Sequence, residues 1–143
     1  MRFLIIALAI LASACSNRYS EEEAIFIVHN RTNDRATALV DGRQIVELAP
    51  NSATNGEIKV LVAHSRTRDY GYGPSQIDKR VEVVVAFKNL RTGGLSREAF
   101  CVAGARVKTT IIYEPQFGTD GYAMCRTLDT YGNAVEPSGS GSQ

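Results

Sequence analysis

Hydrophobic and polar residues alternate along most of the chain between positions 24 and 129, which is the period of a β-strand with one buried face. In residues 57–63 every second residue is aliphatic, and residues 80–89 follow the same rule. The predicted strands cover residues 24–30, 36–40, 43–48, 57–63, 80–89, 95–102, 106–114 and 122–129. No segment of this region has the 3.6-residue period of an amphipathic helix.

Turn residues separate these strands at short, regular intervals. The strongest hairpin signal is Asp41-Gly42, since both residues readily adopt the positive φ angles of a type I′ turn. About seven or eight short strands with one-faced alternation predict an all-β, antiparallel β-sandwich of immunoglobulin-like or transthyretin-like type. A small β-barrel is the alternative. A parallel sheet is disfavoured, because its strands would be apolar on both faces.

The amino terminus has the organisation of an export signal. Arg2 precedes an apolar run over residues 3–11, and the small residues Ala12-Ser13-Ala14 stand directly before Cys15. This arrangement resembles the lipobox of bacterial lipoproteins, although Ala12 stands where that family more often has Leu. The resemblance implies lipid attachment to Cys15 and cleavage before it. The alternatives are a soluble exported protein and an uncleaved membrane helix, for which the run is short of the ~20 residues required.

The chain then divides into a signal peptide (1–14), a lipidated Cys15 with a polar tether (15–23), a β-domain (24–130) and a Gly/Ser-rich tail of disordered composition (131–143). The resemblance places the protein in the cell envelope, anchored through lipid to the outer membrane and facing the periplasm. A secreted or periplasmic soluble protein is the alternative location. The chain of 143 residues is long enough for one small domain, and its net charge of +1 gives no reason to expect nucleic acid as a partner.

Two cysteines remain besides Cys15. Cys101 and Cys125 would be exported to an oxidising compartment, which favours a structural disulfide between them. A reactive or metal-binding pair and two free thiols are the other interpretations. Strand parity places Phe100 on the apolar face and Cys101 on the more polar one, so the bond is expected away from the centre of the core.

One connection is unusually long for a compact domain. Residues 64–79 contain Arg66, Arg68, Tyr70 and Tyr72, the last two alternating with glycine. Tyr and Arg are enriched where proteins bind partners, so these four residues are the candidate binding loop. They would also suit stacking on a glycan. The alternative is a crossover between two sheets whose tyrosines cover the end of the core.

The chain lacks the common catalytic motifs: it contains no G-x-S-x-G, no H-E-x-x-H and no phosphate-binding glycine loop. His29 and His64 end predicted strands, and no spacing makes them a metal site, so no metal or cofactor is expected. The first functional hypothesis is a non-enzymatic module that docks another envelope protein. The second is a protein that binds a glycan or small ligand, or that inhibits a cell-wall enzyme.

Overall fold

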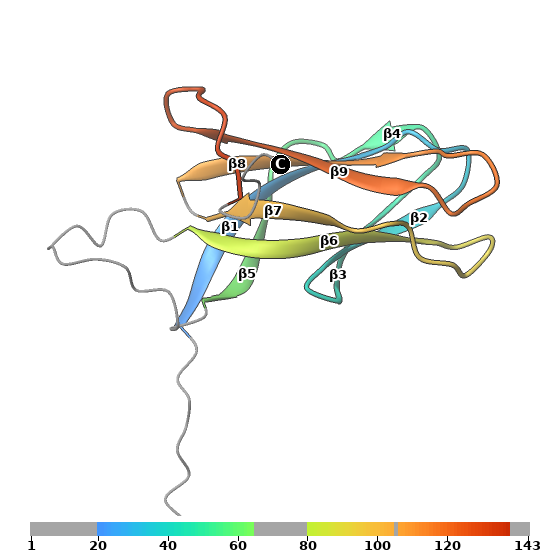
Figure 1. Cartoon of the computed structure of the whole chain (residues 1–143), viewed down its shortest axis with the longest axis horizontal. Helices are drawn as coiled ribbons and strands as arrows, with labels where there is room; N and C mark the ends of the chain where they lie inside the picture. The colour runs from blue at the N-terminus through green and yellow to red at the C-terminus, as the bar shows by residue number, and fades with distance from the viewer. Residues whose placement is uncertain (1–19, 65–79, 105, 138–143) are drawn as a thin grey trace, which may run out of the picture.

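The computed structural model describes residues 20–64, 80–104 and 106–137, and in these ranges it contains strands and no helix. The strands are β1 (Ser20–Asn30), β2 (Ala36–Val40), β3 (Arg43–Leu48), β4 (Ser52–Ala53), β5 (Ile58–His64), β6 (Val81–Asn89), β7 (Ala99–Ala103), β8 (Val107–Glu114) and β9 (Tyr122–Asp129). They form two sheets around one shared hydrophobic core (Figure 1). None of the described elements is a helix that could cross a membrane.

The first sheet has the order β4-β1-β8-β9, with β5 also paired to β1, and the second has the order β3-β2-β6-β7. The predicted all-β class is confirmed. The two sheets do not close into a barrel, so the small-barrel alternative is wrong. The expectation of purely antiparallel pairing is wrong for β1 and β8, which run parallel with Ile25 opposite Lys108. Alternation fixes which side chains share a face but carries no information about the direction of the neighbouring strand.

The predicted hairpin between β2 and β3 is confirmed. Asp41 and Gly42 have φ angles of 49° and 75°, as a type I′ turn requires. Val40 lies opposite Arg43, so Asp41 and Gly42 form the whole loop between the two strands.

Strand β1 begins at Ser20, so the assignment of residues 20–23 to a tether is wrong. These residues pair antiparallel with residues 61–64 of β5. Glu23 is exposed, and its carboxylate lies 3.1 Å from the ammonium group of Lys59.

Residues 131–137 also depart from the sequence interpretation, which placed them in a disordered tail. Asp129 accepts a hydrogen bond from the backbone N–H of Asn133 at its Oδ1 atom (2.8 Å), and the Val135 N–H donates to the carbonyl O of Thr127 (2.9 Å). The backbone N–H of Asn133 is the main cause that lowers the pKa of Asp129. The chain therefore turns back along β9 before the Gly/Ser-rich residues begin.

An aromatic pair joins the two sheets in the core. Phe87 of β6 and Tyr113 of β8 are both buried, and their ring centroids are 4.8 Å apart with the planes 6° from parallel. The Tyr113 hydroxyl donates to the carbonyl O of Asp120 (2.6 Å), which satisfies the polar atom of this side chain. Burial raises the pKa of Tyr113, so the phenol is neutral at physiological pH.

Strands β7 and β9 close one lateral side of the body, which we term the closed side. The Arg97 N–H donates to the carbonyl O of Gly121 (3.0 Å), and the Arg97 carbonyl O accepts from the Ala123 N–H (2.8 Å). Further along, the Thr127 hydroxyl donates to the carbonyl O of Val102 (2.7 Å). Hydrogen bonds thus connect the sheets near both ends of this side.

The other lateral side is formed by β3 and β5, and we term it the open side. Within the described ranges no strand lies on the outer edge of either β3 or β5. Four hydrophobic residues that pack against the core are only half-buried here: Ile45, Val46, Ile58 and Val60. At the closed side the partly buried residues of the core edge are Ala99 and Cys125, so the larger aliphatic side chains are left partly exposed at the open side.

Candidate functional site

Several of the sequence predictions fall outside the described residues. These are the lipidation site Cys15, the candidate binding loop with Arg66, Arg68, Tyr70 and Tyr72, and the last six residues of the tail. The structure does place the ends of the loop. Strand β5 belongs to the first sheet and β6 to the second, so residues 65–79 connect the two sheets. The loop starts where β1 starts, because His64 lies opposite Ser20.

Cys101 and Cys125 form the predicted disulfide, with a Cα–Cα distance of 6.0 Å. Its expected position is wrong. Cys101 is completely buried in the core, whereas its neighbour Phe100 is 66% exposed. The strand that contains Cys101 begins at Ala99 and not at residue 95. The alternation of inward and outward side chains counted from residue 95 therefore does not apply to Cys101. The disulfide therefore joins the sheets in the middle of the closed side, from within the core.

The two histidines lie at opposite ends of β1 and cannot share a ligand. His64 pairs with Ser20, whereas His29 pairs with Ala53 of β4. Nine residues of β-strand separate these positions, which corresponds to about 30 Å. Among the described residues there is no group of three or more His, Cys, Asp or Glu side chains that could hold a metal ion.

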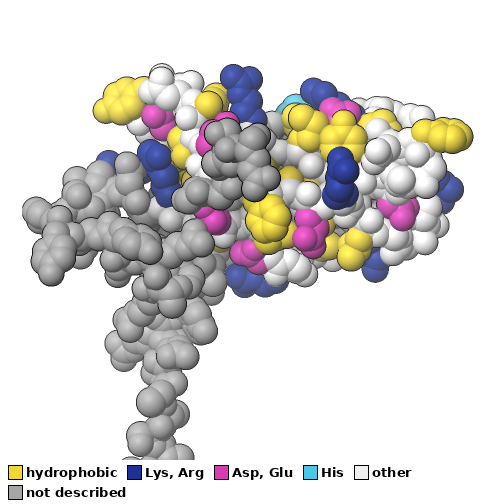
Figure 2. All heavy atoms as spheres, viewed as in Figure 1, with side chains coloured by type: hydrophobic (Ala, Val, Ile, Leu, Met, Phe, Trp, Pro, Cys, Tyr) yellow, Lys and Arg dark blue, Asp and Glu magenta, His cyan; other side chains and the backbone are white. Residues whose placement is uncertain are grey.

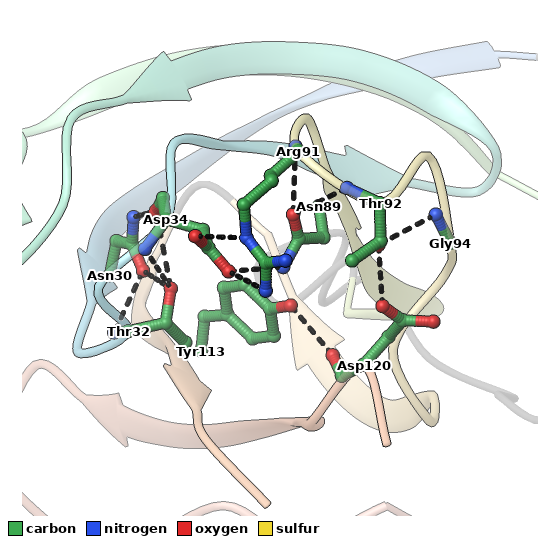
Figure 3. Close-up of polar contacts among 9 residues, drawn as sticks. All are labelled: Asn30, Thr32, Asp34, Asn89, Arg91, Thr92, Gly94, Tyr113 and Asp120. Atoms are coloured by element: carbon green, nitrogen blue, oxygen red, sulfur yellow. Dashed lines mark hydrogen bonds and ion pairs between the residues drawn. The ribbon is translucent and has the colours of Figure 1, made fainter. Parts of the chain in front are cut away.

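A cluster of polar side chains lies at the end of the body where β1 and β6 terminate (Figure 3). We term Asn30, Thr32, Asp34, Asn89 and Arg91 the polar end cluster. Asn30 and Asn89 are buried, one at the end of a strand in each sheet. Their positions follow from the sequence, because Asn and Asp hydrogen-bond the backbone two residues further on and so favour turns that end strands.

Each asparagine accepts a hydrogen bond from the turn that follows it. Asn30 Oδ1 accepts from the backbone N–H of Thr32 (3.0 Å), and Asn89 Oδ1 accepts from the backbone N–H of Arg91 (2.9 Å). Both amide groups also donate to Asp34: Asn30 Nδ2 to its carbonyl O (2.8 Å) and Asn89 Nδ2 to its carboxylate (2.9 Å). Asn30 Nδ2 also donates to the carbonyl O of Ala49 (2.9 Å), so this buried amide is fully engaged within the protein.

The Asp34 carboxylate is the electrostatic centre of the polar end cluster. Arg91 donates to it from Nε (2.7 Å) and from a terminal nitrogen (3.0 Å), in a bidentate arrangement. These hydrogen bonds, followed by that of Asn89, lower the pKa of Asp34. Since the carboxylate is satisfied from within the protein, the cluster is suited to fixing the loops rather than to proton transfer.

Two further loops are joined at this end. The Thr92 hydroxyl, in the β6–β7 loop, donates to Asp120 Oδ1 in the β8–β9 loop (2.6 Å). Gly121 has a φ of 76°, and a Cβ atom there would overlap the carbonyl O of Glu114 and lie 2.9 Å from the Tyr113 ring. The loops therefore have one well-defined arrangement over the aromatic core.

These joined loops carry three exposed hydrophobic side chains that the sequence analysis missed. Leu90 and Leu95 lie in the β6–β7 loop and Phe117 in the β8–β9 loop; Leu95 is 60% exposed and Phe117 fully exposed. We term these three residues the loop-end hydrophobics. The sequence could have indicated these residues, because each is a large apolar residue within a polar, glycine-containing turn. On the face shown in Figure 2, hydrophobic side chains are scattered among charged ones.

The comparisons with known proteins do not place the chain in a family. No protein-family model, curated protein or solved structure matches it.

Proposed function

We propose that this protein is a membrane-anchored envelope lipoprotein that acts as a non-enzymatic docking or structural module for another envelope protein. The observation that carries the proposal is the exposure of Leu90, Leu95 and Phe117 on loops that internal hydrogen bonds hold in place. Exposed apolar side chains on a fixed surface reduce the entropy that is lost when a partner binds. Contiguous apolar surface marks interaction sites, so the proposal takes the three side chains as parts of one contact surface.

The position of the proposed anchor agrees with this role. Five residues lead from Cys15 to Ser20, where β1 begins, so the start of the body would lie within about 17 Å of the lipid. Strand β1 has 11 residues and spans about 35 Å, and the loop-end hydrophobics lie beyond its far end. The strand can therefore carry them away from the bilayer, toward the periplasm.

The chemistry of the polar end cluster supports docking over catalysis. Its carboxylate and both amides are engaged with one another and with the backbone, so the groups that could act on a substrate have structural partners. We also propose that the two-sheet architecture is an immunoglobulin-like or transthyretin-like sandwich, as the strand spacing predicts.

The anchor is tested by growing a bacterial host with labelled palmitate. We expect label on the wild-type chain and none on Cys15→Ala, which should leave the membrane fraction. A Cys15→Ala protein that still partitions into detergent, or an unlabelled wild type that begins at Cys15, contradicts the lipoprotein proposal and favours soluble export.

Docking is tested with a photo-crosslinking residue placed at Phe117 or Leu95 of the full-length protein in its host envelope. We expect one discrete protein adduct from both positions and none from Asn55, an exposed turn residue without a hydrogen bond to its side chain. A photo-crosslinking residue placed at Leu90 should form the same adduct. This adduct should be lost when Phe117→Ser and Leu95→Ser are introduced together. Thermal stabilisation by muropeptides without any protein adduct would instead favour the ligand-binding hypothesis.

A further inference from the structure

Among the described residues, no strand pairs with the outer edge of β5. The backbone N–H and C=O of Val28 in β1 point toward the side where β4 and β5 lie. The carbonyl O accepts from the Thr54 N–H, and the N–H donates to Thr54 Oγ1. Because these groups alternate along a strand, the even-numbered residues of β1 face β5. In the observed register they lie opposite Ile58, Val60, Val62 and His64. The N–H and C=O groups of Lys59, Leu61 and Ala63 therefore point away from β1.

A side-chain contact supports this assignment. One terminal nitrogen of Arg43, from β3 of the other sheet, donates to the carbonyl O of Leu61 (3.2 Å). A guanidinium reaches this oxygen from the open side, which places the oxygen on the outer edge. Among the described residues no strand donates to it.

The side chains at the same edge are incompletely covered. Ile58 and Val60 are half-buried on the inner face of β5, and Ile45 and Val46 are half-buried on β3. In Figure 1, β3 and β5 lie along the lower side of the body, opposite β9. An added strand beside β5 would continue the first sheet, and its inward side chains would cover these four residues.

We infer that the outer edge of β5 is a binding site for an extended strand of a partner protein, which pairs with Lys59, Leu61 and Ala63 and places alternate apolar side chains into the open side. Edge groups that no strand of the described residues pairs with select an extended backbone as the occupant, which would replace Arg43 at the carbonyl O of Leu61. The half-buried aliphatic residues select apolar side chains at every second position. The inference goes beyond the proposed docking role, because it concerns a different surface and does not depend on lipidation.

A second copy of this chain fits the site less well. Pairing of two β5 strands would leave the open side uncovered, since the inward side chains of β5 already pack against their own core. The edges at the closed side are partly covered, because Arg97 bridges to Tyr122, Ala134 bridges to Leu128, and the Thr127 hydroxyl donates to the carbonyl O of Val102.

The first test is amide hydrogen exchange of the purified full-length protein. The amides of Lys59, Leu61 and Ala63 should exchange at least about tenfold faster than those of Val60 and Val62, which pair with β1. Equal protection of both sets in the monomer would mean that another segment of the chain already covers the edge, and would overturn the inference.

The second test identifies the occupant. A photo-crosslinking residue at position 59 in the host envelope should form an adduct with an extended segment of another protein, whereas the same residue at Arg126 should not. A synthetic peptide of the crosslinked segment should then protect the Lys59, Leu61 and Ala63 amides. Adducts with lipid, within one chain or between two copies, or a peptide that leaves these amides unprotected, would overturn the inference.

A proline supplies the matched variant. Leu61→Pro removes an edge N–H without removing a β1–β5 hydrogen bond, and proline is tolerated at such positions of edge strands. The peptide should bind this variant about tenfold more weakly, and Leu61→Thr within about threefold of wild type. Equal binding by Leu61→Pro and Leu61→Thr contradicts strand addition. Adducts at Phe117 that persist in Leu61→Pro show that the docking role stands independently.

Discussion

Asn89 donates a hydrogen bond from its side-chain Nδ2 to Oδ2 of Asp34 across 2.9 Å, and this contact joins the end of β6 to the loop that follows β1. The two residues are 55 positions apart in sequence. The bond connects the two sheets at the end of the body that carries the loop-end hydrophobics.

Replacing Asn89 by Ala should destabilise the protein by about 2 kcal/mol. Its side-chain Oδ1 also accepts from the backbone N–H groups of Arg91 and Thr92, which would lose this partner. The measurement is the urea midpoint of the purified protein. Asn55→Ala, at an exposed turn position, should change the stability by less than about 0.5 kcal/mol. Equal effects of the two substitutions would show that the polar end cluster does not stabilise the fold.

Stability should decrease on acidification through the contribution of Asp34. Its folded-state pKa is lowered from the ordinary value of 3.8, chiefly by the hydrogen bonds from Arg91 and then by that from Asn89. A carboxylate with a lowered pKa stabilises the folded state above its unfolded pKa and loses this contribution as the pH falls through the folded-state value.

The urea midpoint of wild type should therefore fall more steeply between about pH 5 and pH 2 than that of Asp34→Asn. Asp129 contributes with the same sign in both proteins, since its pKa is also lowered. Glu98→Gln is the control, because this carboxylate is exposed and makes no described hydrogen bond or ion pair. Parallel pH profiles for wild type and Asp34→Asn would contradict the prediction.

The disulfide should contribute about 3 kcal/mol, the chain-entropy estimate for a sequence separation of 24 residues. A Cys101→Ala, Cys125→Ala double variant should unfold at a correspondingly lower urea concentration. Wild type treated with reductant should shift toward the double variant, which itself should not respond to reductant. An unchanged midpoint in the double variant would mean that the hydrogen bonds of the closed side suffice.

Alanine substitutions at two glycines of the β8–β9 loop distinguish the cost of a positive φ angle from the cost of steric overlap. Gly118 and Gly121 have nearly equal positive φ angles, 73° and 76°. A Cβ at Gly118 would meet no atom within 4 Å, whereas one at Gly121 would overlap Glu114 and the Tyr113 ring. Gly118→Ala should cost about 1 kcal/mol from φ alone, and Gly121→Ala clearly more. Comparable thermal midpoints for the two variants would argue against the close approach.

Removing the Tyr113 hydroxyl tests the link between the core and the loops. Tyr113→Phe keeps the stacked ring but leaves the carbonyl O of Asp120 without its donor, so stability should fall by about 1–2 kcal/mol. Phe87→Ala removes the stacking partner and should cost about 3–5 kcal/mol. Denaturant unfolding of both variants checks that Phe87→Ala loses more stability than Tyr113→Phe. An unchanged stability of Tyr113→Phe would show that the hydroxyl makes no net contribution.

The sequence by itself determined most of the strands, though not β4 or the start of β1, and the pairing of the two late cysteines. Strands β2, β3 and β9 have the predicted bounds, and Asp41-Gly42 forms the predicted turn, because period-two alternation and positive-φ residues are local signals. Two cysteines besides Cys15 leave one intramolecular pair, which the structure forms.

Only the tertiary structure decided which face of a strand is inside, which strands are neighbours and which edges are unpaired. Phe100 and Cys101 show the first point: parity relates alternate residues, but the packing of β7 against β9 put the cysteine inside and the phenylalanine outside. The parallel β1–β8 pair and the Asn89–Asp34 bond join segments far apart in sequence, and no local pattern encodes such contacts. The outer edge of β5, beside which no described strand lies, likewise depends on the fold, because a strand's edge is defined only by what lies next to it.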